Sequence, residues 1–198
     1  MDDVDETGWG APEHLWVLRH VRIEVLTPAI EDDHVELTTW CSGTAAVAAG
    51  RRMSLSGDRG GRVEVGSAWI HLGPDARPAR IVDFGLYADA AGGRAVTTRL
   101  ELPVPRSDGV AATWPLRVTD VDLLGHVNNA AYWHAVEERL LASGLDPRLA
   151  MCARLDHRHA IDLEDDLELV EVVEPGCLGI AFTVEGVTSA VAWVEHRS

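Results

Sequence analysis

Five polar side chains, three of which can do acid–base chemistry, fall within residues 120–129. They are two aspartates, one histidine and two asparagines: Asp120, Asp122, His126, Asn128 and Asn129. A carboxylate can activate water or attack a carbonyl carbon directly, and a histidine can carry a proton near neutral pH. The cluster therefore predicts chemistry on a carbonyl group. Asp122, His126 and Asn128 are the candidate catalytic residues.

This cluster is expected to form a loop between a strand at 114–119 and a helix at 130–143, with Asn128 or Asn129 as the helix N-cap. The first turn of a helix has free backbone N–H groups and a positive potential, which stabilise an oxygen that becomes negative. We therefore expect a reacting carbonyl to lie at the start of this helix, near Val127.

The rest of the chain predicts an antiparallel, strand-rich fold. In the first strand Val21, Ile23 and Val25 alternate with Arg22 and Glu24, as in a half-buried strand. Proline and glycine residues make the stretch 73–112 a connector, with local helix at 81–90. Strands are predicted at 15–25, 34–41, 62–72, 151–161, 167–174, 177–185 and 187–196.

Similar patterns recur in the same order in both parts of the chain and indicate a tandem repeat. Glu31-Asp-Asp corresponds to Glu164-Asp-Asp, Ser67-Ala-Trp-Ile to Val191-Ala-Trp-Val, and Gly8 to Gly144. The predicted units are 1–73 and 113–198, joined by the connector 74–112. The first unit is roughly 23 residues shorter before its glycine. We expect it to be N-terminally truncated, without its opening strand and most of its helix.

Composition excludes several classes of protein. The formal net charge is −15, with 17 basic residues that are all arginine, so neither nucleic acid nor an anionic membrane surface is an expected partner. No apolar run is long enough to span a bilayer, and the acidic first residues do not resemble a signal peptide. Three widely spaced cysteines favour reduced thiols over a zinc site or disulfides. We expect a soluble, cytoplasmic protein.

The segment Asp120-x-Asp-x-x-Gly-His-Val-Asn-Asn-x-x-Tyr132 resembles the hot-dog thioesterases, in which an antiparallel sheet wraps a long helix. More narrowly, the chain resembles the acyl-acyl-carrier-protein (acyl-ACP) thioesterases, which carry two hot-dog units. Residues 16–25, 35–41 and 50–53 are similar to the N-terminal unit of that family, and residues 5–10 to the end of its first helix. The resemblance implies an α+β, double hot-dog fold.

The same resemblance assigns roles to residues. It places the catalytic aspartate of the family at Asp122, its histidine at His126 and a helix glutamate near Glu138. Plant members carry an asparagine where this chain has Leu124, and a glutamate–cysteine pair where it has Ala160-Ile161. The expected apparatus is therefore simpler, consisting of Asp122, His126 and backbone N–H groups. The expected substrate-binding residues are Val127, Asn129, Tyr132 and Trp133.

The expected function is hydrolysis of fatty acyl-ACP thioesters, which releases free fatty acid in fatty acid biosynthesis. Acyl-CoA hydrolysis and acyl binding without catalysis are the alternatives. No cofactor or metal is expected, because His157 and His159 have no obvious third ligand. The partner is the ACP or CoA thioester, and the chain is a monomer or a homodimer. An anionic carrier needs a basic patch, for which we expect Arg51, Arg52, Arg154 and Arg158.

Overall fold

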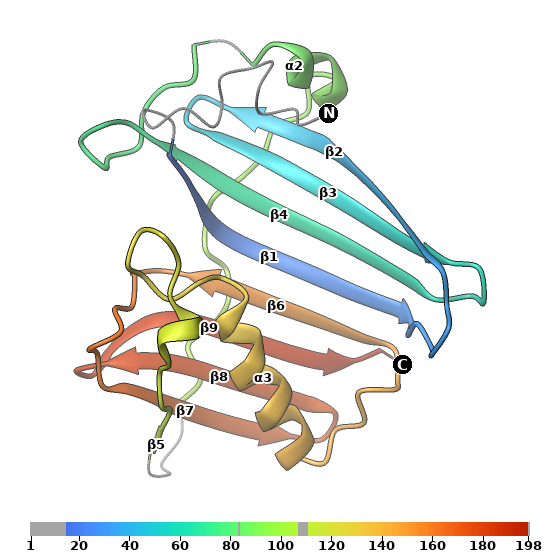
Figure 1. The fold of residues 1–198 in the computed structure, drawn as a ribbon, viewed down its shortest axis with the longest axis vertical. Helices are drawn as coiled ribbons and strands as arrows, with labels where there is room; N and C mark the ends of the chain where they lie inside the picture. The colour runs from blue at the N-terminus through green and yellow to red at the C-terminus, as the bar shows by residue number, and fades with distance from the viewer. Residues whose placement is uncertain (1–14, 83, 107–110, 198) are drawn as a thin grey trace.

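The computed structural model describes residues 15–82, 84–106 and 111–197, which form one large antiparallel sheet with few helices (Figure 1). The strand order is β2-β3-β4-β1-β6-β9-β8-β7-β5. The strands are β1 (Leu15–Thr27), β2 (Val35–Ala45), β3 (Ala48–Gly57), β4 (Arg62–Leu72), β5 (Ala112–Thr113), β6 (Met151–His157), β7 (Leu167–Glu174), β8 (Cys177–Val184) and β9 (Val187–His196).

The sheet has two halves that meet where β1 pairs with β6. Outward from this junction the order is β1, β4, β3, β2 on one side and β6, β9, β8, β7 on the other, so both halves have the same internal order. Across the junction, Val21 lies opposite Leu155 and Val25 opposite Met151. The predicted antiparallel sheet is confirmed. The residues that resembled the end of a first helix lie outside the described ones.

Helix α3 (Ala131–Ala142) covers one face of the second half, which we call the α3 face (Figure 1). Its buried side chains share a hydrophobic core with strand residues such as Leu155, Ile180 and Phe182. Five helix residues are buried: Ala131, Tyr132, Ala135, Val136 and Leu140. The same face of the first half is less covered: Leu37, on that face, is 57% exposed.

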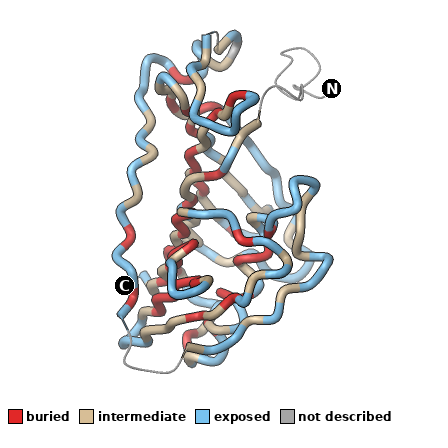
Figure 2. The backbone as a smooth tube through the Cα atoms, turned by 90° about the vertical axis from the view of Figure 1, so that its left-hand side faces the viewer, coloured by how far each residue is buried: buried red, intermediate tan, exposed pale blue. Residues whose placement is uncertain are grey.

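The connector crosses the opposite face, which we call the back face. After helix α2 (Leu86–Ala91), residues 98–106 run as a strap behind the sheet (Figure 2). The buried carboxylate of Asp156 accepts hydrogen bonds from the backbone N–H groups of Glu101 and Leu102, each 3.0 Å long. The Trp193 indole N–H donates to the carbonyl of Pro103 at 2.8 Å. The strap is thus fastened to β6 and β9.

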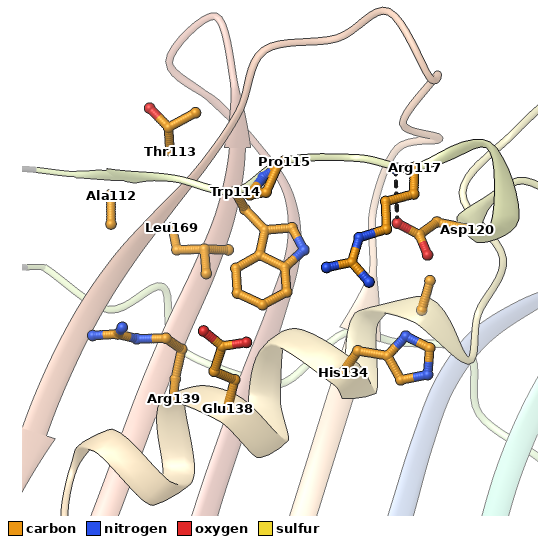
Figure 3. A pocket seen from close by; sticks show the side chains of 11 residues that line it. Ala112, Thr113, Trp114, Pro115, Arg117, Asp120, His134, Glu138, Arg139 and Leu169 are labelled. Carbon is orange, nitrogen blue, oxygen red and sulfur yellow. Dashed lines mark hydrogen bonds between the residues drawn. The ribbon is translucent and has the colours of Figure 1, made fainter.

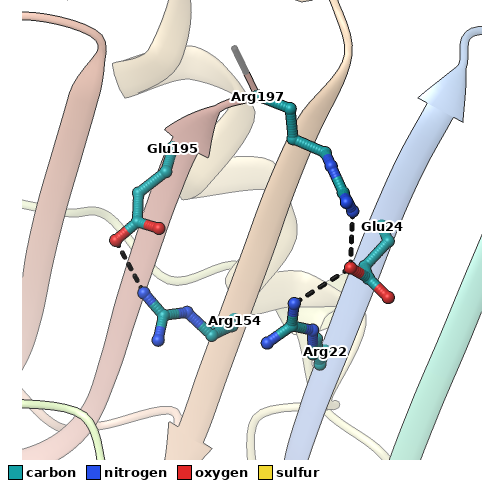
Figure 4. Close-up of polar contacts among 5 residues, drawn as sticks. All are labelled: Arg22, Glu24, Arg154, Glu195 and Arg197. Carbon is teal, nitrogen blue, oxygen red and sulfur yellow. Dashed lines mark hydrogen bonds and ion pairs between the residues drawn. The ribbon is translucent and has the colours of Figure 1, made fainter.

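A group of ion pairs lies on the back face where the two halves meet, and one of the pairs joins the halves (Figure 4). Glu24 on β1 pairs with Arg22 on the same strand and with Arg197 just after β9. Arg154 on β6 pairs with Glu195 on β9 at 2.7 Å. Arg22 and Arg154 lie directly opposite each other, so these carboxylates offset a repulsion between like charges.

The strand predicted at 114–119 is wrong. The chain pairs with β7 only over Ala112–Thr113, and the Trp114 N–H adds one bond to the carbonyl of Leu167. Pro115 has no N–H to continue the pairing, and a short 3-10 turn, η1 (Val118–Asp120), follows. In the described ranges, no helix has both the length and the apolar character needed to cross a bilayer.

Candidate active site at the start of helix α3

Asp122 and His126 lie at opposite ends of one tight turn that precedes α3. The N–H of Asp122 donates to the carbonyl of His126 at 2.9 Å. The residues that flank this pair, Val121 and Val127, form an isolated antiparallel β-bridge. The carboxylate Oδ1 of Asp122 accepts the N–H of Leu124 at 2.8 Å and that of His126 at 3.4 Å. Gly125 makes the turn possible with a φ of 85°. One carboxylate and one imidazole are therefore held by the same short loop.

The His126 ring also meets a second carboxylate from a distant part of the chain. Its Nδ1 lies 2.6 Å from Oδ1 of Asp162, and both side chains are about half exposed. Asp162 is the first residue of an acidic run, Asp162-Leu-Glu-Asp-Asp. Nothing in the local sequence indicates the contact, because the partners are 36 residues apart.

Hydrogen bonds already occupy most backbone N–H groups at the start of α3. The N–H of Val127 donates to Ile161, and that of Asn128 to Asp120. The side-chain oxygen of Asn128 accepts the N–H of Ala130, which is the N-cap residue. The predicted cap at Asn128 or Asn129 is therefore wrong by one or two positions. Among the described residues from 127 to 131, only Asn129 has a backbone N–H without a hydrogen-bond partner.

Tyr132 and Trp133, in the first turn of α3, face different surroundings. Tyr132 is 4% exposed and packs edge-on against His157 and Phe182, with ring centroids 4.9 and 5.2 Å away. Burial raises the pKa of its hydroxyl well above the usual value, so it remains protonated. Trp133 is half-buried against the core. Both residues are packing surfaces beside the turn rather than proton donors.

A cleft of about 330 Å³ runs beside α3, between the helix and the segment that follows β5 (Figure 3). His134 and Glu138 line it from the helix, and Trp114, Arg117 and Asp120 line it from the other side. The expected family glutamate at Glu138 therefore points into this cleft, and Asp122 is not among the residues that line it.

A smaller cavity of about 10 Å³ lies next to the cleft and shares Trp114, Asp120 and Ala131 with it. Its other walls are mostly apolar: Leu116, Val127, Tyr132, Leu167 and Phe182. Val127 and Tyr132 thus contribute buried side chains to an apolar gap beside the helix start. Trp114 lines both this gap and the open cleft.

The four arginines expected to form a basic patch do not form one. Arg51 and Arg52 are neighbours on β3, so their side chains leave opposite faces of the sheet. Arg154 is paired with Glu195, and Arg158 donates to the carbonyl of Leu102 in the strap. Within the described part of the chain, no three His, Cys, Asp or Glu side chains come together in a metal-binding arrangement.

The large antiparallel sheet with few helices is a fold that this chain shares with solved thioesterase structures. Residues 105–190 match the family model described as the acyl-ACP thioesterase C-terminal domain. The match includes the turn with Asp122 and His126, helix α3, and Asp162.

Solved structures share the fold at low sequence identity. An acyl-ACP thioesterase from Bacteroides thetaiotaomicron superposes with a TM-score of 0.77 at 16% identity, covering 98% of this chain and 83% of that chain. The 12:0-ACP thioesterase from Umbellularia californica superposes with a TM-score of 0.72 at 17% identity, covering 96% of this chain and 78% of that chain.

An uncharacterized protein of Mycobacterium tuberculosis strain H37Rv is 31% identical over 128 residues, or 63% of this chain. Its counterpart in strain CDC 1551 matches equally well. This chain spans about half the length of these curated relatives, covering 51% of each.

Proposed function

We propose that this protein hydrolyses fatty acyl-ACP thioesters and releases free fatty acid in fatty acid biosynthesis. The observation that carries the proposal is the turn before α3, in which the Asp122 carboxylate accepts the backbone N–H of His126 at 3.4 Å. This turn lies in the segment that matches the thioesterase family model. The shared fold of the solved thioesterases supports the same reading.

In the proposed reaction, Asp122 acts as general base or nucleophile and His126 carries the proton. Asp122 takes a proton from water as the water oxygen attacks the thioester carbonyl carbon. His126 carries that proton to the sulfur as the C–S bond breaks, so the products are a carboxylic acid and a free thiol and both side chains return to their starting state. The N–H of Asn129, with the side-chain amide of Asn128, is the donor set that remains for the oxyanion.

The acyl chain is proposed to lie beside α3, where the apolar gap lined by Val127 and Tyr132 adjoins the site. At about 10 Å³ this gap holds a long chain only after side chains move, and Trp114 is a large side chain that lines both this gap and the larger cleft. Trp133 would contact the substrate from the helix start.

The chain is further proposed to consist of two hot-dog units, at 1–73 and 113–198, joined by residues 74–112. The equal strand order of the two halves of the sheet supports this division. A cytoplasmic location is proposed because Cys41, Cys152 and Cys177 are all free thiols, which suits a reducing compartment.

The test measures thiol release from acyl-ACP and acyl-CoA substrates of graded chain length, with the wild type and Asp122→Asn. Asp166→Asn is the matched control, because it removes the same charge at an exposed residue outside the turn. We expect kcat with acyl-ACP to fall by on the order of a hundredfold or more in Asp122→Asn and to be unchanged in the control.

Other outcomes of this assay would replace the proposal. Turnover of acyl-CoA alone would identify an acyl-CoA thioesterase. Tight binding of acyl thioesters without thiol release would identify an acyl-binding protein, an alternative favoured by the small number of free N–H groups at the helix start. Equal turnover by Asp122→Asn and the wild type would remove Asp122 from the mechanism.

A further inference from the structure

We propose that Asp162 is a positioning residue, which holds His126 with Nδ1 protonated and so leaves Nε2 free to exchange a proton with the substrate. This inference rests on the proposed function, because it assigns the partner of the histidine in that site. It concerns a carboxylate that neither the sequence motif nor the family pattern assigned.

Backbone pairing also holds His126 and Asp162 next to each other. His126 and Asp162 form an antiparallel bridge, and the next residues continue it, because the N–H of Val127 donates to the carbonyl of Ile161 at 2.8 Å. Ile161 is fully buried, with 0% exposure. The two side chains therefore start from backbone positions that are held side by side, and their contact at 2.6 Å follows from the fold.

Asp162 is held from its C-terminal side as well. Its own N–H donates to the Asp165 carboxylate at 2.8 Å, which closes a short turn. The Asp162 side chain thus projects from a segment with a buried anchor before it and a closed turn after it. The position of the Asp162 side chain is therefore set by the backbone on both sides of it.

Arg19, from the other half of the sheet, binds the chain just before Asp162, at the end of β6. Arg19 lies at an irregularity in β1, where the pairing with β4 shifts between Leu18 and His20. Its guanidinium donates to the carbonyl of His157 at 2.8 Å, at the end of β6. The following N–H groups, of Arg158 and His159, both donate to Ser189. Bulges of this kind often redirect a side chain next to a functional site.

The chemical consequence concerns the tautomer of His126. A carboxylate has only acceptor oxygens, so the ring nitrogen that faces it must carry the proton. Nδ1 faces Asp162, and Nε2 is therefore the unprotonated nitrogen of the neutral ring. In water a neutral histidine usually has the opposite tautomer, so removal of the carboxylate would leave the wrong nitrogen protonated for most of the time.

A structural role alone would be weak at this place. The two side chains are 47% and 56% exposed, and ion pairs that are this exposed contribute little to folding. The loss of Asp162 is therefore expected to leave the fold intact. Stability and proton chemistry can then be tested separately.

The closing experiment compares the wild type with Asp162→Asn and the matched control Asp166→Asn. The first readout is the ¹⁵N–¹H correlation spectrum of the nine histidine rings, with the His126 signals assigned by their loss in His126→Gln. We expect the Nδ1–H form in the wild type and the control, and a shift to the Nε2–H form in Asp162→Asn. This readout needs no substrate, so it decides the tautomer even if no thioester is hydrolysed.

The second readout is kinetic. We expect Asp162→Asn to lower kcat on the order of ten- to a hundredfold with little change in KM, and to move the acid limb of the pH–kcat profile towards lower pH. An Nε2–H ring in the wild type would overturn the proposal. So would an active Asp162→Asn enzyme with unchanged kcat and pH profile. A wild type inactive on every thioester would instead contradict the proposed function alone.

Discussion

The ring of His157, at the end of β6, packs at right angles to the ring of Tyr132 on α3, with centroids 4.9 Å apart. This contact joins the strand to the helix that begins at the candidate site. His157 is 8% exposed, and its Nε2 has no hydrogen-bond partner among the described residues. A charge on this ring would therefore be poorly solvated.

Stability should fall on mild acidification because of His157. Burial, together with the nearby Arg19, lowers the pKa of His157 from 6.5 to about 4. Between these values the unfolded chain binds a proton that the folded chain does not. Stability is therefore complete above pH 6.5 and is lost as the pH falls towards 4, by about 3 kcal/mol in total.

Urea unfolding at a series of pH values measures this effect. His157→Leu should flatten the pH dependence between 6.5 and 4, whereas His159→Gln, at an exposed position two residues away, should keep it. An equal pH dependence in all three proteins would show that His157 does not cause the loss.

The strap should depend on Asp156. A single carboxylate oxygen accepts both strap N–H groups, so Asp156→Ala would leave one buried and one partly buried donor unsatisfied. We expect a loss of about 2–4 kcal/mol and faster tryptic cleavage after the strap residue Arg99. Asp156→Asn, which keeps an acceptor oxygen, should have a smaller effect. Equal cleavage rates in the wild type and Asp156→Ala would contradict this role.

Two glycines on the back face provide a matched pair of substitutions. A Cβ at Gly179 would meet the Trp193 ring at 2.8 Å, whereas a Cβ at Gly66 would meet only the Arg52 side chain at 3.6 Å. Gly179→Ala must displace the indole that bonds to Pro103, so we expect a cost of about 1–2 kcal/mol. Gly66→Ala should lie within about 0.5 kcal/mol of the wild type. Thermal unfolding of both variants checks the difference.

The ion pair between Arg139 on α3 and Glu171 on β7 should behave as a coupled unit. The two atoms are 2.6 Å apart, and both side chains are largely buried. Arg139→Met would leave a carboxylate in a poorly solvated place, at a cost of about 2–4 kcal/mol, whereas the double variant with Glu171→Leu should regain most of it. A double-mutant cycle by urea unfolding measures the coupling. Additive losses would argue against the pair.

Hydropathy patterns predicted most of the sheet because burial on one face imposes strict alternation. The strands at 167–174 and 187–196 begin and end as expected, and the predicted helix is observed at Ala131–Ala142. Helix ends were less predictable. The Asn128 side chain accepts the N–H of Ala130, as a cap would, but the N-cap residue is Ala130. Which residue becomes the N-cap depends on backbone angles as well as on residue type.

The repeat pattern was informative only in part. Val35 and Leu167 follow the two acidic landmarks and begin strands at matching places in the sheet order. The tryptophan landmarks, however, point to opposite faces. Trp69 packs with the core, whereas Trp193 covers Gly179 on the back face. A shift of one residue in a strand reverses the side chain, and a short local match cannot reveal that shift.

The pairing of β1 with β6 has a consequence for any attempt to produce the second half alone. A fragment of residues 113–198 would carry β6 with a row of unsatisfied N–H and C=O groups where β1 had been. The side chains beside that row, Met151, Ala153 and Leu155, are apolar. Such an edge recruits any strand that fits, so the isolated fragment should self-associate through β6.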